Sequence, residues 1–305
     1  MRVFLTGASG YVGSYILRAL LAHGHTPRCL VRSSAADLAV QDDAIEPVQG
    51  DVTRPASLDG ALADCDAVIH LVGILEEHPS QGVTFERLHV DGTQHVVDAA
   101  QNAGIDRFVH MSANGARPEG GTAYHRTKWD AEQIVMTAGF AHWTLFRPAL
   151  LFGKPDPDRP EFSSRLLHDL VRPFPVLPVF GDGTYELQPV HVEEVADAFV
   201  QALTLPAAHE QTYVAAGPDR LPYTEVLDRI ARGAGLSPKP KVHIPLPLAR
   251  LGVSTVGRLG LLPISPAQFE MLVEGNTGDA AAFFRDFDPS PRPYTSENLQ
   301  YLQSM

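Results

Sequence analysis

The stretch TAYHRTKWDAE, residues 122–132, contains two side chains that could move a proton. Tyr124 and Lys128 are four residues apart, which is one helical turn, and Ser112 precedes them. A tyrosine with an ordinary pKa of about 10 is a poor acid or base at neutral pH. A lysine one turn away lowers the pKa of that phenol by its charge, and a serine hydroxyl can donate to an oxygen that gains negative charge. We therefore predict Ser112, Tyr124 and Lys128 as catalytic residues.

The same three residues also have a structural interpretation. Side chains at positions i and i+4 are neighbours on any helix, so the pair could be a core-facing tyrosine and a solvated lysine, with Ser112 as a cap. Hydride transfer at a carbonyl needs a proton donor, a group that tunes it and a hydrogen-bond donor beside a nicotinamide. A dinucleotide site elsewhere in the chain would therefore favour the catalytic interpretation.

A glycine-rich loop near the N-terminus predicts such a site. The stretch TGASGYVG has a G-x-x-G-x-x-G spacing between an apolar strand and an amphipathic helix. The first glycine allows a sharp turn, the second a close approach to a pyrophosphate, and the third lets the helix pack on the strand. A tight structural turn is the alternative. The predicted cofactor-binding residues of this loop are Gly7, Ser9, Gly10, Tyr11, Val12 and Gly13.

The end of the second predicted strand indicates which dinucleotide binds. NAD sites usually have an acidic residue there, about 20 residues after the glycines, which bonds to the ribose hydroxyls. This sequence has Arg32 followed by Ser33, and its first acid is Asp37. A guanidinium suits the 2′-phosphate of NADP, whereas a solvated surface arginine is the alternative. The pattern favours NADP(H) over NAD(H).

Two further loops are predicted to contact the cofactor. Asp51 and Val52 follow the third strand, where the acid could accept from the adenine amino group and the valine could cover the ring. A turn-capping role for Asp51 is equally compatible with the sequence. Leu71, Val72 and Gly73 follow the fourth strand and would lie beside the cofactor riboses by topology alone. Lys128 could in addition hold the nicotinamide ribose.

The elements that must position these residues alternate in type over the first 150 residues. Short apolar runs such as RVFLT, CDAVIHLV and DRFVHM predict strands, and amphipathic stretches between them predict helices. Strands that are apolar throughout indicate a parallel sheet covered on both faces. The predicted fold is therefore α/β, a Rossmann-type doubly wound parallel sheet whose carboxyl edge binds ligands.

Proline-rich stretches become frequent after about residue 150. They predict a smaller, loop-rich substrate lobe that retains helices at VEEVADAFVQALTL and PYTEVLDRIARGAG. We predict a dinucleotide-binding domain over residues 1–155, with additions from about 175–205, and a mainly substrate-side lobe over 156–305. The tail from residue 289 is expected to be partly extended and poorly constrained.

Composition limits the classes of function. A net charge of −12, with 44% hydrophobic and 20% charged residues, indicates a globular protein and argues against a nucleic acid or an anionic membrane as main partner. Two cysteines, no evident signal peptide and no uncharged apolar run of about 20 residues predict a cytoplasmic protein without stable membrane insertion. The histidines form no metal-binding motif, so no metal is expected.

Together the motifs resemble the short-chain dehydrogenase/reductases of the extended or atypical type. The resemblance rests on TGASGYVG, GDV, HVDGT, YHRTK and FRPALLFG, and HMSANGA and LQPVHVEEVADA are similar to the branch of the NADPH-holding accessory subunit of respiratory complex I. It implies that Arg147 and Pro148 begin a loop to the nicotinamide end of the cofactor, which adds Pro148 to the cofactor-binding residues. It also implies that Gln188 and His191 lie near the active-site cleft.

Two departures from this family keep the reaction open. His89 in HVDGT stands where sugar-modifying members usually have an asparagine that braces the backbone, and only eleven residues separate Ser112 from Tyr124. An NADP(H)-dependent oxidoreductase acting on a small organic carbonyl or alcohol is the leading hypothesis. A nucleotide-sugar epimerase or dehydratase and a non-catalytic NADP(H)-binding assembly protein are the alternatives. A small-molecule substrate is the expected partner, and a homodimer is compatible with the family.

Overall fold

A computed structural model describes residues 1–156, 159–255 and 264–305, and its chain divides into two compact units. Unit 1 comprises Met1–Pro148, Glu193–Ala215 and Ala280–Pro289. Unit 2 comprises Ala149–Val192, Ala216–Asp279 and Ser290–Met305. The chain passes between the units several times, so neither is a continuous stretch of sequence.

Unit 1 is built on a seven-stranded parallel sheet with the order β11-β6-β5-β4-β1-β2-β3. Its strands are β1 (Arg2–Thr6), β2 (Thr26–Val31), β3 (Glu46–Gln49), β4 (Ala67–His70), β5 (Arg107–Met111), β6 (His142–Pro148) and β11 (Gln211–Ala215). The strand order reverses between β1 and β4, which is where open parallel sheets bind ligands at their carboxyl edge. The sheet confirms the predicted Rossmann-type fold.

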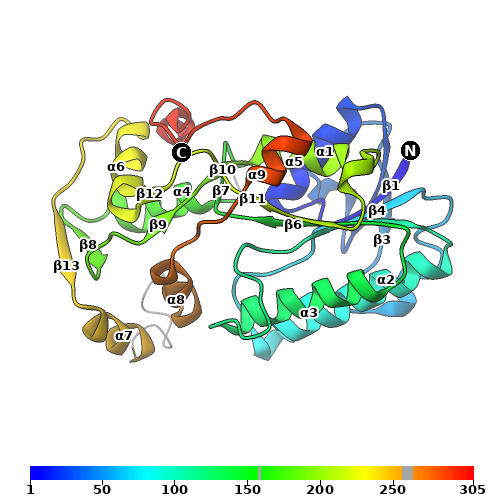
Figure 1. The fold of residues 1–305 in the computed structure, drawn as a ribbon, viewed down its shortest axis with the longest axis horizontal. Coiled ribbons are helices and arrows are strands. Elements are labelled where there is room, and N and C mark those ends of the chain that lie inside the picture. The colour runs from blue at the N-terminus through cyan, green and yellow to red at the C-terminus, as the bar shows by residue number, and fades with distance from the viewer. Residues whose placement is uncertain (157–158, 256–263) are drawn as a thin grey trace. The chain divides into compact units, whose positions relative to one another are not determined.

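Helices cover both faces of this sheet. They are α1 (Tyr11–Ala22), α2 (Gly92–Asn102), α3 (Ala123–Thr137), α5 (Val192–Gln201) and α9 (Ala281–Phe287). Figure 1 shows α2 and α3 on one face and α1, α5 and α9 on the other. A π-helical segment, η4 (Glu86–Asp91), leads directly into α2. This three-layer arrangement explains why the central strands are apolar on both sides.

Each face of the sheet has its own apolar layer. On the face of α2 and α3, Phe108 stacks on Phe140 with ring centroids 5.0 Å apart, and both rings are buried. On the other face, Phe146 of β6 stacks on Phe199 of α5 at 4.4 Å. Burying a side chain of this size contributes about 1.5–3 kcal/mol. The two layers hold the strand ends in the fixed positions that a binding site needs.

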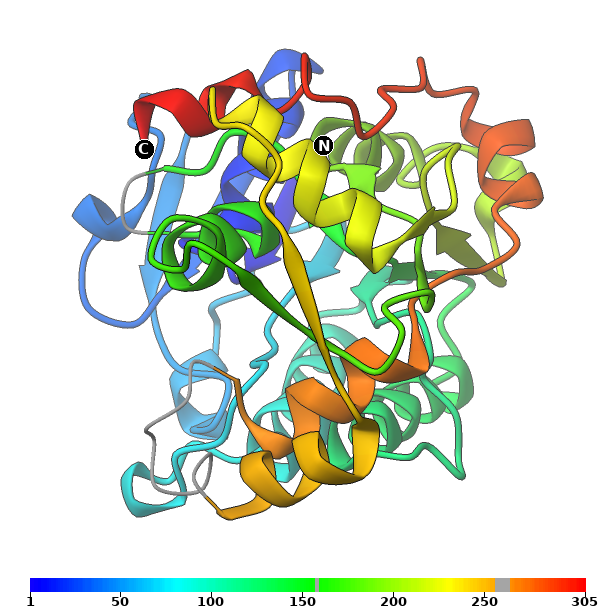
Figure 2. The same cartoon turned by 90° about the vertical axis from the view of Figure 1, so that its left-hand side faces the viewer.

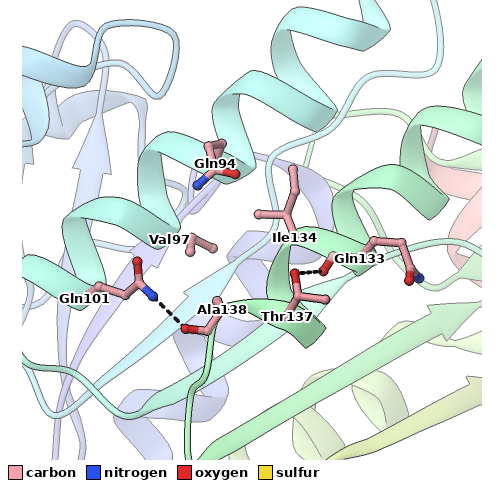
Figure 3. A pocket seen from close by; sticks show the side chains of 7 residues that line it. All are labelled: Gln94, Val97, Gln101, Gln133, Ile134, Thr137 and Ala138. Atoms are coloured by element: carbon pink, nitrogen blue, oxygen red, sulfur yellow. Dashed lines mark hydrogen bonds between the residues drawn. The ribbon is translucent and has the colours of Figure 1, made fainter.

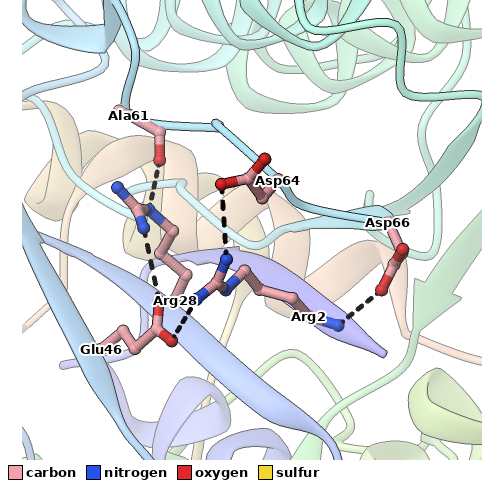
Figure 4. Close-up of polar contacts among 6 residues, drawn as sticks. All are labelled: Arg2, Arg28, Glu46, Ala61, Asp64 and Asp66. Carbon is pink, nitrogen blue, oxygen red and sulfur yellow. Dashed lines mark hydrogen bonds and ion pairs between the residues drawn. The ribbon is translucent and has the colours of Figure 1, made fainter.

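Charged side chains link the neighbouring strands β1, β2 and β3 near their amino ends (Figure 4). Arg2 of β1 donates to the Glu46 carboxylate of β3 at 2.7 Å, and Arg28 of β2 donates to the same carboxylate at 3.3 Å. The backbone N–H of Arg2 donates to Asp66, and the Arg2 guanidinium lies 3.7 Å from Asp64. About a third of the Arg2 and Glu46 side chains is exposed, so solvent screening leaves these pairs with little weight in the stability of the sheet.

A shallow pocket lies between α2 and α3 (Figure 3). It is lined by Gln94, Val97, Gln101, Gln133, Ile134, Thr137 and Ala138. Gln101 donates across it to the carbonyl oxygen of Ala138 at 2.6 Å. The α3 residues that line it belong to the second half of the helix, whereas Tyr124 and Lys128 lie near its start. The pocket is therefore separate from the predicted catalytic residues.

Unit 2 consists of short strand pairs and helices. The pairs are β7 (Leu151–Phe152) with β10 (Val190–His191), β9 (Glu186–Leu187) with β12 (Leu221–Pro222), and β8 (Leu177–Phe180) with β13 (Lys241–Ile244). The helical segments are α4 (Phe162–Leu166), η5 (Leu167–Val171), α6 (Tyr223–Gly233), α7 (Leu246–Thr255), α8 (Pro266–Glu274) and η8 (Gln300–Ser304). Figure 2 shows β13 beside β8 and leading into α7. Among the helices that the structure describes, none combines the length and the hydropathy that a membrane-spanning segment needs.

The C-terminal tail is packed into unit 2, so the expectation of a poorly constrained tail is wrong. Tyr294, Leu299 and Leu302 are at most 1% exposed and belong to the apolar core of this unit. Leu299 lies so close to Gly233 of α6 that a Cβ there would be 2.5 Å from the Cβ of Leu299. The tail is fixed because its apolar residues bury against α6, which its prolines conceal in the sequence.

Candidate active site

The glycine loop between β1 and α1 packs tightly at its first and last glycines. Gly7 has a φ of +76°, and the N–H of Gly10 donates to its carbonyl oxygen at 3.0 Å. A Cβ at Gly13 would overlap that same oxygen. No side chain caps the start of α1, and its first turn contains no acid. The N-terminus of a twelve-residue helix is thus open to an anion, as a dinucleotide pyrophosphate requires.

The loop after β4 lies against the glycine loop. A Cβ on Gly7 would be 3.2 Å from the Cβ of Leu71, and the N–H of Leu71 donates to the Thr6 hydroxyl at 3.3 Å. Thr6 also bonds to Nδ1 of His70 at 2.7 Å. Leu71, the first of the predicted ribose residues Leu71–Gly73, therefore lies beside the predicted phosphate loop at the carboxyl edge of the sheet.

The residues predicted to bind the adenosine end of the cofactor differ from one another in exposure and in their contacts. Arg32 is exposed directly after β2. The Asp51 carboxylate accepts from the N–H and the hydroxyl of Thr53, each at 2.9 Å, so it caps a turn. Burial alone would raise the pKa of Asp51, but these bonds and the charges of Arg32 and Arg54 lower it. Val52 is 4% exposed.

Lys128 reaches from α3 to the ends of two strands. Its ammonium donates to the carbonyl oxygen of Met111, the last residue of β5, at 3.0 Å. A Cβ on Gly73 would lie 2.8 Å from the same nitrogen. Burial lowers the pKa of Lys128 to about 8, although the charge of Glu132 acts to raise it. The structure therefore holds a buried positive charge between the predicted ribose loop and Ser112.

Tyr124 is half-buried among aromatic rings. Phe85, His89 and His125 meet it edge to face, with centroids 5.7, 5.5 and 5.5 Å from that of the phenol. Burial raises the pKa of Tyr124 to about 12. This differs from the predicted lowering by Lys128. Packing among these rings disfavours the charged phenolate, so the phenol is harder to deprotonate than a tyrosine in water.

Ser112 is buried at the end of β5 with an unused hydroxyl. Its N–H donates to the carbonyl oxygen of Phe146 at 2.7 Å, and the residue is 1% exposed. Its Oγ has no hydrogen-bond partner among residues 1–156, 159–255 and 264–305. Leaving a buried hydroxyl unpaired costs about 1–3 kcal/mol, which is typical of a group that bonds to a ligand.

His89 braces the site, a role that the sequence did not reveal. Its Nε2 accepts from the N–H of Ile74 at 3.0 Å, so its Nδ1 carries the proton and donates to the Thr127 hydroxyl at 2.9 Å. Thr127 in turn donates to the carbonyl oxygen of Ala123 at 2.9 Å. The imidazole thus ties the loop after β4 to the helical turn between Tyr124 and Lys128. Burial and the charge of Lys128 lower the pKa of His89 to about 2, which keeps the ring neutral.

A buried ion pair fixes α3 to β6. The Glu132 carboxylate is fully buried and accepts from Nε and Nη2 of Arg147 at 2.7 and 2.6 Å. The guanidinium also lies 5.6 Å from the ring of Trp129. Pro148, predicted at the nicotinamide end, follows Arg147 directly and accepts from the N–H of Asn114 at 3.0 Å. The pair was missed because its two members are 15 residues apart and on different elements.

Gln188 and His191, which the family resemblance implies near a cleft, both make contacts within unit 2. Gln188 donates to the carbonyl oxygen of Gly217 at 2.8 Å and accepts from the N–H of Gly278 at 3.0 Å. His191 packs edge to face on Phe152, and burial lowers its pKa to about 4, with the charge of Arg292 acting in the same direction. In unit 2 Gln188 therefore links separate segments of the chain.

Comparisons with known proteins agree with this architecture. The signature of the NAD dependent epimerase/dehydratase family matches residues 3–216. The mitochondrial NADH-ubiquinone oxidoreductase 40 kDa subunit of Neurospora crassa is 27% identical over 305 residues, covering 98% of this chain and 78% of that protein. The ceramide reductase of Caulobacter vibrioides is 29% identical over 257 residues, covering 84% and 76%. The structure of MoeE5 in complex with UDP-glucuronic acid and NAD has a similar fold, with a TM-score of 0.76 at 21% identity over 100% of this chain and 98% of that chain.

Proposed function

Because the chain belongs to the NAD-dependent epimerase/dehydratase family, we propose that it is an oxidoreductase that uses NADP(H) to act on a small organic carbonyl or alcohol. Family membership confirms the resemblance predicted from the motifs. One observation carries the proposal. The buried Lys128 ammonium and the unpaired Ser112 hydroxyl lie at the carboxyl ends of neighbouring strands, on the edge where the glycine loop also opens.

The residues around this edge fit a nicotinamide dinucleotide. The loop of Gly7, Gly10 and Gly13 would hold the pyrophosphate, since it offers backbone N–H groups and an uncapped helix start. Lys128 would bond to ribose hydroxyls, and Arg32 would receive the 2′-phosphate. When bound, the nicotinamide supplies or accepts the hydride. Reductase activity in the ceramide reductase of Caulobacter vibrioides supports the redox assignment.

Tyr124 would transfer the proton and Ser112 would stabilise the reacting oxygen. As a substrate carbonyl becomes an alkoxide, Oη of Tyr124 donates its proton to that oxygen, and the Oγ–H of Ser112 donates a hydrogen bond to it. A phenol with a pKa of about 12 is fully protonated at neutral pH. This state suits reduction of a carbonyl, whereas alcohol oxidation would first require the phenolate.

The test measures NADPH oxidation with a panel of carbonyl substrates. Tyr124→Phe removes the donated proton and keeps the ring contacts, so kcat should fall about 10²- to 10⁴-fold with little change in the affinity for NADPH. Tyr185→Phe is the matched control, because its buried hydroxyl has no partner in the described part of the chain. Equal rates for wild type and Tyr124→Phe would remove Tyr124 from the chemistry.

A non-catalytic assembly protein is the second candidate. It is favoured by the similarity to the respiratory subunit of Neurospora crassa over 98% of this chain. A binding role needs neither the proton donor nor the unpaired serine, so Tyr124 and Ser112 weigh against it. If every carbonyl fails while NADPH still stabilises the protein in a thermal melt, this second candidate replaces the first.

The nucleotide-sugar alternative rests on fold likeness to proteins such as MoeE5, whose structure contains UDP-glucuronic acid. The short interval between Ser112 and Tyr124 weighs against it, because a loop that frames a sugar would be curtailed. Thermal melts with a set of nucleotide sugars separate the two reactions. Stabilisation by one of them would favour the epimerase or dehydratase.

A further inference from the structure

The arginines at the two ends of strands β2 and β3 differ in their partners. Near the amino ends, Arg28 donates to the Glu46 carboxylate at 3.3 Å, so the protein itself neutralises its charge. At the carboxyl ends, Arg32 follows β2 and Arg54 lies in the loop after β3, and both residues are exposed. Within the described residues, neither of these two guanidinium groups forms an ion pair. Since ligands bind at the carboxyl edge of a parallel sheet, both groups are placed to receive an anion.

The backbone brings Arg32 and Arg54 to the same carboxylate. The side-chain amide of Gln49, the last residue of β3, donates to the carbonyl oxygen of Arg32 at 3.4 Å. In the loop that follows, the N–H of Arg54 donates to the carbonyl oxygen of Asp51 at 2.9 Å and closes a turn. Burial acts to raise the pKa of the Asp51 carboxyl, but two hydrogen bonds and the charges of Arg32 and Arg54 lower it. Both guanidinium groups therefore lie close enough to this carboxylate for their charges to act on it.

A third arginine beside this turn already has its partners. Arg87 of η4 donates from Nη1 to the carbonyl oxygen of Gly82 at 3.1 Å and from Nη2 to the Thr53 hydroxyl at 3.4 Å. Two neutral oxygen atoms thus hold its guanidinium, whereas the guanidinium groups of Arg32 and Arg54 are exposed to solvent and keep their donors for a ligand. Arg87 adds the same charge to this region, so it provides a comparison for the effect of charge alone.

We propose that Arg54 is a second residue, besides Arg32, that selects NADP(H) by binding its 2′-phosphate. The inference rests on the proposed function, because it places the adenosine end of the cofactor at the loop of Asp51. A phosphate monoester carries a charge of about −1.5 to −2 near pH 7, so one guanidinium neutralises only part of it and a second can add charge-assisted hydrogen bonds. The sequence does not reveal this role, since Arg32 and Arg54 become neighbours only through the pairing of β2 with β3.

Titration calorimetry of the full chain with NADPH and with NADH tests the proposal. The two cofactors differ only in the 2′-phosphate, so the ratio of their dissociation constants reports the contacts to that group. Arg54→Gln should weaken NADPH binding about 5- to 20-fold and leave NADH binding within about twofold, because the exposed side chain makes no ion pair that the substitution would break. The double variant Arg32→Gln with Arg54→Gln should lose most of the preference for NADPH.

Two control variants remove the same charge elsewhere. Arg87→Gln should change the affinities for NADPH and NADH by the same factor, and Arg165→Gln, which alters an exposed arginine of α4 in unit 2, should change neither affinity. If Arg87→Gln lowers the preference for NADPH as much as Arg54→Gln does, the preference comes from the summed charge and the assignment of Arg54 is wrong.

The wild-type ratio distinguishes this inference from the proposed function. A wild type that prefers NADPH, together with an Arg54→Gln variant that keeps the whole preference, would overturn the role of Arg54 and leave the proposed use of NADP(H) intact. Equal affinities of the wild type for NADPH and NADH would overturn both.

Discussion

His89 connects the two halves of the candidate site through both ring nitrogens. If this brace positions Lys128 against the loop after β4, His89→Ala should lower stability by about 2–4 kcal/mol, because it leaves the N–H of Ile74 without its acceptor, removes a donor to the Thr127 hydroxyl and opens a cavity. It should also lower kcat at least tenfold with a smaller change in KM, since misplaced groups lose transition-state contacts. Chemical denaturation and steady-state kinetics measure the two effects.

A conservative replacement distinguishes whether His89 positions the reacting groups or only stabilises the fold. His89→Asn keeps a side chain that can accept from Ile74, so it should recover part of kcat. His78→Ala, an exposed side chain in the same loop, should change neither quantity. If His89→Ala unfolds more easily but turns over as fast as wild type, the imidazole supports the fold and not the reaction.

Arg32 decides the choice of cofactor if it contacts the 2′-phosphate. A charge-assisted bond of this kind contributes about 1.5–3 kcal/mol, which corresponds to a preference for NADPH over NADH of roughly 10- to 100-fold. Arg32→Ala should remove most of that preference and leave NADH binding nearly unchanged. Arg32→Asp should reverse it, because an acid repels the phosphate and accepts from a ribose hydroxyl. Titration calorimetry measures the affinity of each protein for NADPH and NADH. Equal affinities of the wild type for the two cofactors would show that Arg32 is a solvated surface charge.

At the scale of elements, α3 couples the protonation of Lys128 to Glu132 one turn away. Burial brings the pKa of Lys128 to about 8, so the ammonium is present below that pH and is lost above it. If the ammonium is needed, kcat/KM for carbonyl reduction should fall above about pH 8. Glu132→Gln removes the charge that raises the pKa of Lys128, so the fall should begin at lower pH.

The control for this pH profile lies on the same helix. Asp130→Asn also removes one negative charge from α3, but its side chain is exposed, so solvent screens its effect on Lys128. The profile of Asp130→Asn should match that of the wild type. A wild-type rate that stays constant to pH 10 would show that the charge of Lys128 is not required.

An element could be predicted from the sequence when the pattern that indicates it lies within a short stretch of residues. The alternation of apolar strands and amphipathic helices is local, and so is the turn of the glycine loop, so the sheet was predicted correctly in type and order. That the glycine loop binds a phosphate stays a prediction. The tail and the ion pair of Glu132 with Arg147 depend on contacts between distant segments. His89 illustrates the limit, since its position drew attention but its partners Ile74 and Thr127 follow only from the fold.

The whole molecule contains several buried neutral histidines, which makes its stability depend on pH. Burial lowers the pKa of His70 to about 3, of His89 to about 2, and of His110 well below its ordinary value, with the charge of Lys128 adding to the effect at each. Above about pH 6.5 these groups are neutral in both the folded and the unfolded chain and contribute no pH dependence. Below about pH 6.5 the unfolded chain takes up protons that the folded chain excludes, so the free energy of unfolding decreases as the pH is lowered.

The change in the free energy of unfolding with pH has an upper limit. Each such histidine lowers the free energy of unfolding by up to about 1.4 kcal/mol per pH unit, and three approach about 4. Glu161 and Asp197 act in the opposite direction, because burial raises the pKa of Glu161 to about 7 and that of Asp197 above its ordinary value, whereas His191, with a pKa lowered to about 4, adds to the effect of the three histidines. Domains are stable by about 5–15 kcal/mol, so unfolding in acid should begin near pH 5, as circular dichroism during a pH titration would show.

Replacement of His110 tests the cause of this acid sensitivity. Neither ring nitrogen of His110 has a hydrogen-bond partner among the described residues, so His110→Phe removes a titrating group without breaking a bond. At pH 7.5 its stability should equal or exceed that of wild type, and the slope below pH 6.5 should fall by about 1.4 kcal/mol per unit. His168→Gln changes an exposed histidine and should keep the wild-type slope. If both variants lose stability in acid as steeply as wild type, the buried imidazole of His110 does not contribute to the dependence.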